Sequence, residues 1–335
     1  MTQLSVIIVN YKSAGFIIDC LQSASQFPSF NDFEWIIVDN QSNDDSKEII
    51  TNQFPNVIWH DMGYNAGFAR ANNAGIRLAK GEYILLLNPD TLILNDAIAV
   101  CLQKFSNSND VACGVQMLNK DRTTQISGSH FMKGGLNHLL PLPYWGHFLK
   151  LISSMFKVKK PSIEKASAEE KVDWISGAFL MVKTDAIKKC GLLDEDFFLY
   201  GEEVEWCSRL GKIGTLSIYG AIHIIHIMGE VISANANSAD KSYTNLFDKK
   251  GLQLIMSNHV RIRKQYGIIW FLIQLMNYSI AVPIFFVGSF LEQLFQFKNP
   301  FKDFGKAMGL ARNVLLIWAH CITIIQNRPH FYKVL

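Results

Sequence analysis

A regular alternation of apolar strands and helical stretches over the first hundred residues is the feature that most constrains the fold of this chain. The runs SVIIVN, EWIIVD and EYILLL each contain four or five consecutive apolar residues, and each is followed by a stretch with helical spacing of its apolar residues. Continuous apolar strands are typical of a parallel sheet that helices cover on both faces. The pattern therefore predicts an α/β fold built from βαβ units.

Polar residues stand where these predicted strands end. Asn10, the pair Asp39 and Asn40, and the residues Asn88 and Asp90 all follow apolar runs. In parallel sheets, ligands bind outside the carboxyl ends of the strands. We therefore expect these five residues to belong to one ligand site.

The C-terminal region differs from the rest of the chain in charge and hydropathy. Residues 1–240 hold 20 Lys and Arg against 26 Asp and Glu, a net charge of −6, whereas residues 241–335 hold 12 against 3, a net charge of +9. Residues 267–291 contain no charged side chain, and about twenty apolar residues suffice to cross a bilayer. Three interpretations stay open for this region: peripheral or re-entrant membrane contact, one or two true spans, and buried helices of a soluble domain.

The basic residues that flank the uncharged run favour an anionic cytoplasmic membrane surface as the partner. They are Arg261, Arg263, Lys264, Lys298, Lys302 and Lys306. No nucleic-acid-binding motif accompanies them, so no nucleic acid partner is expected. The N-terminal run is interpreted as a buried strand rather than a signal peptide, and the six scattered cysteines indicate reduced thiols in a cytosolic setting rather than a zinc site.

Residues 131–171 interrupt the α/β pattern. The segment begins as an apolar, aromatic and basic stretch with two prolines, and residues 161–171 are interpreted as a solvated linker. We expect a flexible insertion. It forms either a mobile surface loop with a short helix, or a flap over an acceptor site or a second membrane contact.

Five sequence blocks carry a resemblance to a known family. They are IIVDNQSNDDS (36–46), YNAGFARANNAGI (64–76), LLLNPDT (85–91), WISGAFLMV (174–182) and FFLYGEEVEWCSR (197–209). In this order they resemble family 2 of the inverting glycosyltransferases, and most of all its bacterial rhamnosyltransferase-type members. The resemblance covers about residues 3–230.

The resemblance implies the GT-A fold, a Rossmann-like, mostly parallel sheet with helices on both faces. It places a catalytic domain over residues 1–240, with a nucleotide-sugar half over about 1–120 and an acceptor half over about 121–240. Residues 241–335 would then form a helical, apolar and basic region that associates with a membrane.

The same resemblance assigns nucleotide-sugar binding to the strand ends. Asp39 is expected to accept from an N–H of a pyrimidine base, with Asn10 and Asn40 beside it, although a helix cap or Asx-turn would also explain Asp39. A second group lies at the start of a predicted helix, whose N–H groups suit a phosphate or sugar hydroxyls. Its members are Asn65, Gly67 and Arg70.

A cation site is expected at the end of the LLLNPDT strand. Asp90 stands at the last position of the D-x-D motif of the family, in which Asn88 here replaces the first Asp. One carboxylate suffices for Mg²⁺ or Mn²⁺ when substrate phosphates and water complete the shell. His226 resembles a histidine near the metal or diphosphate, and neutral imidazole suits Mn²⁺. The alternatives are a turn at Asp90 and a hydrogen-bonded core histidine.

A general base is expected in the acidic stretch from Asp194 to Leu210, where six carboxylates lie among aromatic residues. Glu203 stands where the family has an Asp that acts as the base, and Glu202 is its rival. Crowded carboxylates and aromatic neighbours raise the pKa of a glutamate toward neutrality, which suits a base. A solvated helix N-terminus is the structural alternative.

The remaining predicted residues lie on the acceptor side or support the helix. Gly177 and Ala178 would form the floor beside the acceptor, and Trp174 would stack on a sugar or belong to the core. Glu205 and Arg209 have the i, i+4 spacing of a helical ion pair, either structural or facing a phosphate.

These residues predict an inverting, metal-dependent glycosyltransferase. It would move L-rhamnose from dTDP-rhamnose, or a hexose from a UDP-sugar, to a hydroxyl of a lipid-linked or cell-surface glycan at the cytoplasmic face of a bacterial inner membrane. A glycoside hydrolase also needs two carboxylates, but it leaves the polar strand ends unexplained. The replacements at Asn88 and Glu203 keep open a catalytically inactive, membrane-docked nucleotide-sugar binding protein.

Overall fold

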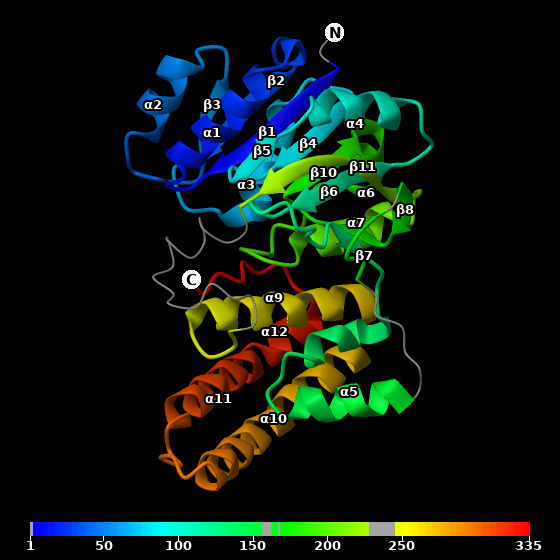
Figure 1. Ribbon diagram of the computed structural model, residues 1–335. Coiled ribbons are helices and arrows are strands. Elements are labelled where there is room, and N and C mark those ends of the chain that lie inside the picture. The colour runs from blue at the N-terminus through cyan, green and yellow to red at the C-terminus, as the bar shows by residue number, and fades with distance from the viewer. Residues whose placement is uncertain (1–2, 156–161, 167, 228–244) are drawn as a thin grey trace. The chain divides into compact units, whose positions relative to one another are not determined.

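The computed structural model describes residues 3–155, 162–166, 168–227 and 245–335. The chain divides into two compact units, which are described separately here (Figure 1). Unit 1 contains residues 1–130, 162–198 and 202–239. Unit 2 contains residues 131–161, 199–201 and 240–335. The predicted domain boundary at 240/241 falls outside the described residues.

The main sheet of unit 1 has the strand order β3-β2-β1-β4-β10-β6-β11-β5, and β8 also pairs with β11. The strands are β1 (Leu4–Asn10), β2 (Glu34–Asp39), β3 (Ile58–Asp61), β4 (Tyr83–Leu87), β5 (Thr91–Ile93), β6 (Ala112–Leu118), β8 (Glu169–Val172), β10 (Phe179–Lys183) and β11 (Leu216–His226). A small second sheet joins β7 (Gly128–Ser129) to β9 (Trp174–Ile175).

Helices cover both faces of this sheet (Figure 1). They are α1 (Ala14–Ser25), α2 (Ser46–Gln53), α3 (Gly67–Leu78), α4 (Ala97–Ser106), α6 (Thr184–Cys190) and α7 (Glu202–Leu210), with a 3-10 helix η1 (Pro28–Asp32). Helices α1 and α4 share one core cluster with Leu4, Val6 and Ile8. Helix α3 packs on the other face, where a Cβ on Gly75 would lie 2.5 Å from Cγ2 of Ile7.

The direction of the strands confirms part of the expected pattern and corrects another part. Strands β1, β2, β3 and β4 are parallel, as the βαβ rhythm predicts. Strands β5, β8 and β10 run antiparallel to their neighbours, so the sheet is mixed. The interpretation of 161–171 as a linker is wrong at its end, because Glu169–Val172 forms β8. This strand pairs with β11, a long-range contact that local composition does not reveal.

Unit 2 is helical in its described part. Its elements are η2 (Lys133–Leu139), α5 (Trp145–Met155), α9 (Lys249–Tyr266), α10 (Ile268–Phe295), α11 (Phe304–Ala319) and α12 (Cys321–Gln326). Helix α10 packs against α9, α11, η2 and α5. Residues 131–155 of the expected insertion thus group with the tail rather than with the α/β core.

Helix α10 is, among the described residues, the helix that is long and apolar enough to cross a membrane by length and composition. A shorter apolar run in the sequence, over residues 314–325, is divided between α11 and α12. A single continuous span is therefore not formed there.

Candidate active site

The first group of predicted residues meets at the ends of β1 and β2. The amide Nδ2 of Asn10 donates to Oδ1 of Asp39 at 2.7 Å and to Oγ of Ser42 at 2.9 Å. The backbone N–H of Ser42 donates to the other carboxylate oxygen of Asp39 at 3.0 Å. Because all three residues are buried, the carboxylate of Asp39 is held rigidly at the strand end.

A second group of hydrogen bonds joins the end of β2 to the start of α3. Asn40 donates to the side-chain oxygen of Asn65 at 3.1 Å and accepts from the backbone N–H of Ala66 at 2.7 Å. The N–H of Phe68 donates to the carbonyl of Phe198 at 2.8 Å. Protein acceptors thus occupy the N–H groups of Ala66 and Phe68. The predicted nucleotide-sugar role of Asn65, Gly67 and Arg70 stays a prediction.

Gly67 is required for close packing at the same place. Its φ is +74°, and a Cβ there would lie only 2.2 Å from the carbonyl oxygen of Phe198. A side chain at this position would push the 194–198 stretch away from α3. Arg70 holds the same stretch, because its Nε donates to the carbonyl of Glu195 at 3.0 Å. Gly67 and Arg70 thus position the acidic stretch that precedes α7.

Asp90 and His226 form a buried pair. Asp90 follows β4, His226 is the last residue of β11, and Oδ1 of Asp90 lies 3.4 Å from Nε2 of His226. The amide nitrogen of Asn88 also lies 3.4 Å from Nε2 of His226. The predicted cation-site residues therefore come together, although they are far apart in the sequence.

Gln125 determines which nitrogen of His226 carries the proton. The Nε2 of Gln125 donates to Oδ1 of Asn119 and to the carbonyl of His226, both at 2.7 Å. Its Oε1 is therefore the acceptor that faces Nδ1 of His226 at 3.0 Å. A neutral ring that donates from Nδ1 has its lone pair on Nε2, which faces Oδ1 of Asp90 and the amide nitrogen of Asn88.

Glu203 lies beside Gly177 and Phe68. A Cβ on Gly177 would be 3.6 Å from Cβ of Glu203 and 3.5 Å from the ring of Phe68. The next residue, Ala178, accepts from the backbone N–H of Asn88 at 3.0 Å. Residues 177–178 thus connect the predicted base to the end of β4. Glu202 is buried, whereas Glu203 is half-buried.

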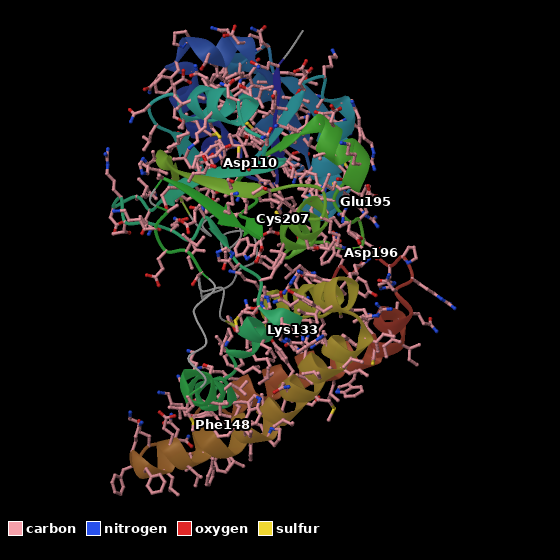
Figure 2. All side chains as sticks on the ribbon, turned by 90° about the vertical axis from the view of Figure 1, so that its right-hand side faces the viewer. Asp110, Lys133, Phe148, Glu195, Asp196 and Cys207 are labelled. Atoms are coloured by element: carbon pink, nitrogen blue, oxygen red, sulfur yellow. The ribbon has the colours of Figure 1, made fainter. Side chains whose placement is uncertain are left out.

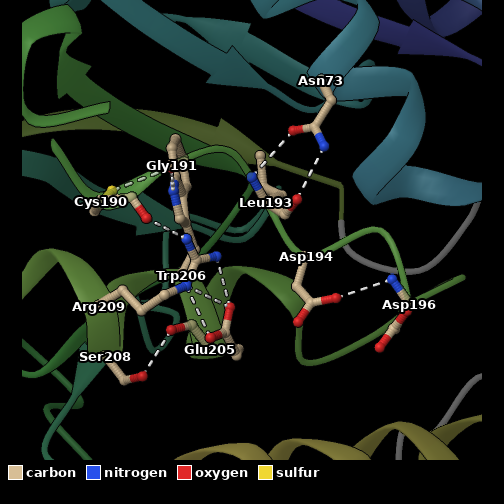
Figure 3. A network of polar contacts seen from close by, with 10 residues as sticks. All are labelled: Asn73, Cys190, Gly191, Leu193, Asp194, Asp196, Glu205, Trp206, Ser208 and Arg209. Atoms are coloured by element: carbon tan, nitrogen blue, oxygen red, sulfur yellow. Dashed lines mark hydrogen bonds and ion pairs between the residues drawn. The ribbon is translucent and has the colours of Figure 1, made fainter. Parts of the chain in front are cut away.

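Glu205 and Arg209 form the ion pair that their spacing predicts, and it is structural (Figure 3). The Nε of Arg209 donates to Oε1 of Glu205 at 2.8 Å, and its Nη2 donates to Oε2 at 2.7 Å. Its Nη1 donates to the carbonyl of Cys190. Burial alone would lower the pKa of the Arg209 guanidinium, but the hydrogen bond and charge of Glu205 raise it. This pair fastens α7 to the end of α6.

The other acidic residues of the stretch are also used locally. The N–H of Asp196 donates to Oδ1 of Asp194 at 2.9 Å, a turn contact visible in Figure 3. Glu195 accepts from Nη2 of Arg77 at 2.7 Å.

Trp174 lies half-buried on β9, where it pairs with Ser129. This pairing does not place Trp174 beside Glu203, so the predicted acceptor role of Trp174 stays a prediction.

The sheet topology places the two polar groups at one edge. Strands β1, β2 and β4 are parallel, and β11 runs in the same direction because both β10 pairings are antiparallel and β6 and β11 are parallel. The C-terminal residues of these strands therefore lie along the same edge of the sheet. Direct hydrogen bonds join Asn10 to Asp39, and a separate set joins Asn88 to His226.

The donors at Asp90 and His226 fit a divalent cation. A buried carboxylate that faces an imidazole lone pair is favourable only when a proton or a cation lies between them. Among the residues that the structure describes, no cluster of three or more His, Cys, Asp or Glu side chains could hold a metal ion. Mg²⁺ and Mn²⁺ need only one or two protein ligands when substrate phosphates complete the shell. Asp90 and His226 would supply the protein ligands of such a site.

Comparison with known families gives this site its context. The family model described as "Glycosyl transferase family 2" matches residues 5–173, half of the chain. The chain belongs to glycosyl transferase family 2. The expected family and the expected class of enzyme, a glycosyltransferase, are thereby confirmed.

Relatives of this family 2 chain include two rhamnosyltransferases. The chain is 28% identical over 236 residues to the low-salt glycan biosynthesis hexosyltransferase Agl10 of Haloferax volcanii, with 67% of each chain covered. It is 28% identical to rhamnosyltransferase WbbL of Escherichia coli, covering 48% of this chain and 60% of WbbL. It is 27% identical to the N-acetylglucosaminyl-diphospho-decaprenol L-rhamnosyltransferase of Mycobacterium tuberculosis, covering 55% and 62%. The match thus spans about three fifths of each rhamnosyltransferase.

Solved structures confirm the GT-A fold of this family 2 chain. A mannosyltransferase from Pyrobaculum calidifontis, solved with GDP-Man and Mn²⁺, matches with a TM-score of 0.51 at 12% identity. The match covers 94% of this chain and 86% of the mannosyltransferase chain. GalNAc-T7, solved with UDP, GalNAc and Mn²⁺, matches with a TM-score of 0.50 at 15% identity. The match covers 67% of this chain and 43% of the GalNAc-T7 chain. At these identities the likeness extends to the fold.

Sequence reasoning missed three residues that hold the site of this family 2 chain. Gln125 gave no signal, because it stands in a short polar loop 101 residues from His226. Ser42 is one of several polar residues in a turn and gives no separate signal. Phe198 has an apolar side chain, and it is its carbonyl that makes the contact with α3.

Proposed function

We propose that the chain is an inverting glycosyltransferase that uses Mg²⁺ or Mn²⁺ and a pyrimidine nucleotide-sugar, dTDP-rhamnose or a UDP-hexose. The observation that carries the proposal is the buried pair of Asp90 and His226, whose facing atoms are 3.4 Å apart at the edge where Asn10 and Asp39 also lie. The proposed acceptor is a hydroxyl of a lipid-linked or cell-surface glycan.

The residues have distinct proposed roles. Asp39, held by Asn10 and Ser42, accepts from an N–H of the pyrimidine. Asp90 and His226 hold the cation, which would neutralise the charge of the departing nucleoside diphosphate. Glu203 removes the proton of the acceptor hydroxyl as that oxygen bonds to the anomeric carbon. The bond from this carbon to the diphosphate breaks, and the configuration inverts.

The proposed acceptor and location draw on two observations. One relative is named for rhamnosyl transfer to a diphospho-decaprenol carrier, which is a lipid-linked acceptor. Unit 2 supplies an apolar helix long enough for membrane contact. We propose that the protein works at the cytoplasmic face of a bacterial inner membrane, where such an acceptor and a soluble nucleotide-sugar meet.

The test is a thermal-shift series on the full chain. It uses dTDP-rhamnose, UDP-glucose and GDP-mannose, each with and without Mn²⁺. A ligand that binds only the folded protein raises its melting temperature with the ratio of free ligand to dissociation constant. The proposal expects a Mn²⁺-dependent rise with a pyrimidine nucleotide-sugar. No rise with either pyrimidine donor would overturn it.

A variant pair locates the cation in the same assay. Asp90→Asn should abolish the Mn²⁺-dependent part of the rise. The control Asp185→Asn changes an exposed carboxylate on α6, paired with Lys188, and should keep the whole rise. Equal Mn²⁺ dependence in both variants would show that Asp90 is not a ligand. Donor binding without transfer to any lipid-linked acceptor would instead favour the inactive binding protein.

A further inference from the structure

Helix α10 is apolar on two opposite faces. Its inner face is buried, and Phe271, Leu275, Tyr278 and Phe285 belong to it. Its outer face is an exposed apolar stripe with helical spacing. The members of this stripe are Ile269, Leu272, Ile273, Met276, Ile280, Val287, Leu291 and Leu294. A helix on a water-facing surface normally carries polar residues outside, so this stripe needs an apolar partner.

Hydrogen bonds tie the first half of α10 to the rest of unit 2. The side-chain amide of Gln274 donates to the carbonyls of Gly134 and Gly135 at 2.8 and 2.9 Å. The hydroxyl of Tyr278 donates to the carbonyl of His138 at 3.2 Å. Nε1 of Trp145 donates to Oδ1 of Asn277 at 2.8 Å.

These bonds argue against α10 as a lone span. Their partners lie on η2 and α5, of 7 and 11 residues, which are too short to cross a bilayer. If α10 crossed without them, the amide nitrogen of Gln274 and Oδ1 of Asn277 would lose these partners in hydrocarbon, at a cost of several kcal/mol each. Helix α10 therefore keeps one face on unit 2 and offers only the other to lipid.

The turn from α10 to α11 combines exposed rings with exposed cations. We define the Phe-Lys turn as residues 295–306, FQFKNPFKDFGK. Phe295, Phe297 and Phe301 are 78%, 99% and 59% exposed. The lysines of the turn, Lys298, Lys302 and Lys306, are also exposed. Rings that enter the acyl boundary beside ammonium groups at the phosphate level are typical of a peripheral membrane contact.

The backbone at Phe297 is strained in a way that keeps its ring outside. Its φ is +54°, in the left-handed region that a bulky residue rarely adopts. The N–H of Lys298 donates to the carbonyl of Gln293 at 2.9 Å, which closes a helix end where glycine is the usual residue at the position of Phe297. The ring of Phe297 is almost fully exposed, so its packing within the described residues does not offset the backbone strain. This points to a contact outside the chain.

Helix α5 adds a second apolar and basic surface to unit 2. Phe148, labelled in Figure 2, is exposed together with Leu151 and Met155, and Lys150 stands between them in the sequence. Near the start of α5 and the middle of α10, an apolar hollow is lined by Tyr144, Pro283, Ile284, Val287 and Gly288. Unit 2 thus presents apolar surface on more than one helix, with lysines nearby.

We propose that unit 2 docks on an anionic phospholipid bilayer from one side, by inserting the Phe-Lys turn and the outer face of α10 without α10 crossing the bilayer. This rests on the proposed function, to which it adds the mode of membrane contact. The phosphates of anionic lipids complement Lys298, Lys302 and Lys306. A neutral apolar protein surface would match the rings but would not account for the three lysines among them.

Vesicle flotation of the full chain tests the proposal. The vesicles contain phosphatidylcholine with 25% phosphatidylglycerol, and neither donor nor acceptor is added. One variant replaces Phe295, Phe297 and Phe301 by Ser, and a second replaces Lys298, Lys302 and Lys306 by Gln. Each lysine near an anionic surface contributes roughly a fivefold gain in partitioning, so the lysine variant should bind about 100-fold more weakly. The phenylalanine variant should lose flotation.

Matched controls remove the same kinds of group elsewhere. Ile49→Ser with Val100→Ser removes exposed apolar residues from unit 1, and Lys188→Gln with Lys189→Gln removes exposed charge there. Both controls should float like the parent. Circular dichroism and the donor thermal shift in the absence of vesicles verify the fold, so a failure of docking is distinguished from a failure of the proposed function.

Three outcomes would overturn the proposal. Unchanged flotation of both test variants would show that the turn does not insert. Parent protein that stays in vesicles after extraction at pH 11 would show a true span. The third outcome concerns a parent protein that does not float. If light scattering gives this protein the mass of a dimer in solution, and the phenylalanine variant the mass of a monomer, the surface is assigned to a second copy of the chain.

Discussion

Nδ1 of His226 lies 3.0 Å from Oε1 of Gln125, and both donors of that amide are directed to other acceptors. The amide orientation follows from these bonds, so the imidazole has one favoured neutral tautomer. Residues that orient a metal-binding histidine change metal affinity 10- to 100-fold when they are replaced. Gln125 is therefore a positioning residue of the proposed cation site.

Replacing Gln125 should weaken Mn²⁺ binding. Gln125→Leu removes the acceptor for Nδ1 and should lower the affinity for Mn²⁺ by about 10- to 100-fold. Gln125→Glu keeps an acceptor and should lose less. The measurements are Mn²⁺ titration by electron paramagnetic resonance and the ¹⁵N shifts of His226, which report the tautomer. Gln103→Leu, at an exposed position on α4, is the control. Parent-like affinity and shifts in folded Gln125→Leu would contradict the role.

Replacing Glu203 and replacing Glu202 should have different effects on the kinetics of transfer. Glu203→Gln should lower the rate of transfer by about 10²- to 10⁴-fold while donor binding is kept, because a general base acts on the acceptor proton. Glu202 is 3% exposed, so Glu202→Gln should act mainly on the melting temperature. Transfer rates and donor dissociation constants of both variants decide the matter. A rate lost in Glu202→Gln and kept in Glu203→Gln would reverse the assignment.

Features of the structure that depend on local sequence pattern can be predicted from the sequence. Apolar runs such as 4–9 are buried on both faces and form parallel strands, and the polar residues after them lie at the C-terminal edge of the sheet. The i, i+4 spacing of Glu205 and Arg209 was likewise enough to predict their pairing. These features arise from neighbours in the chain.

Other features depend on contacts between distant residues, which a single sequence does not display. The antiparallel direction of β10 follows from its insertion between β4 and β6, which no turn signal near 179–183 indicates. The pairing of Gln125 with His226 spans 101 residues. The packing role of Gly67 could not be predicted, because the carbonyl that excludes a side chain there belongs to Phe198, 131 residues away in the sequence.

Two glycines with the same backbone conformation offer a matched test of that contact. Gly63 and Gly67 both have a φ of +74°, but a Cβ on Gly63 would meet no atom within 4 Å. Gly63→Ala should cost about 1 kcal/mol in the free energy of unfolding, from the left-handed backbone alone. Gly67→Ala adds an overlap with the carbonyl of Phe198 and should cost about 3 kcal/mol. Urea denaturation measures both, and equal costs would mean that the 194–198 stretch shifts freely.

Buried histidines should make unit 2 sensitive to acid. His259 on α9 is 1% exposed; its Nδ1 donates to the carbonyl of Ile255, and its Nε2 has no hydrogen-bond partner among the described residues. Burial lowers the pKa of His259 from 6.5 to about 4, against a smaller opposite effect of the Ile255 hydrogen bond. Burial, with the charge of Arg261, also lowers the pKa of His138.

Because the folded state binds these protons more weakly than the unfolded state, the free energy of unfolding should fall as pH drops from 6.5 to about 4. His259 alone accounts for about 3 kcal/mol of this loss. Thermal denaturation of the full chain across that range should show a smaller decline for His259→Gln than for the parent, relative to each protein at pH 7. His147→Gln, at an exposed position on α5, should decline like the parent. A parallel decline in all three proteins would mean that His259 gains its proton without unfolding, so that water reaches Nε2 in the native state.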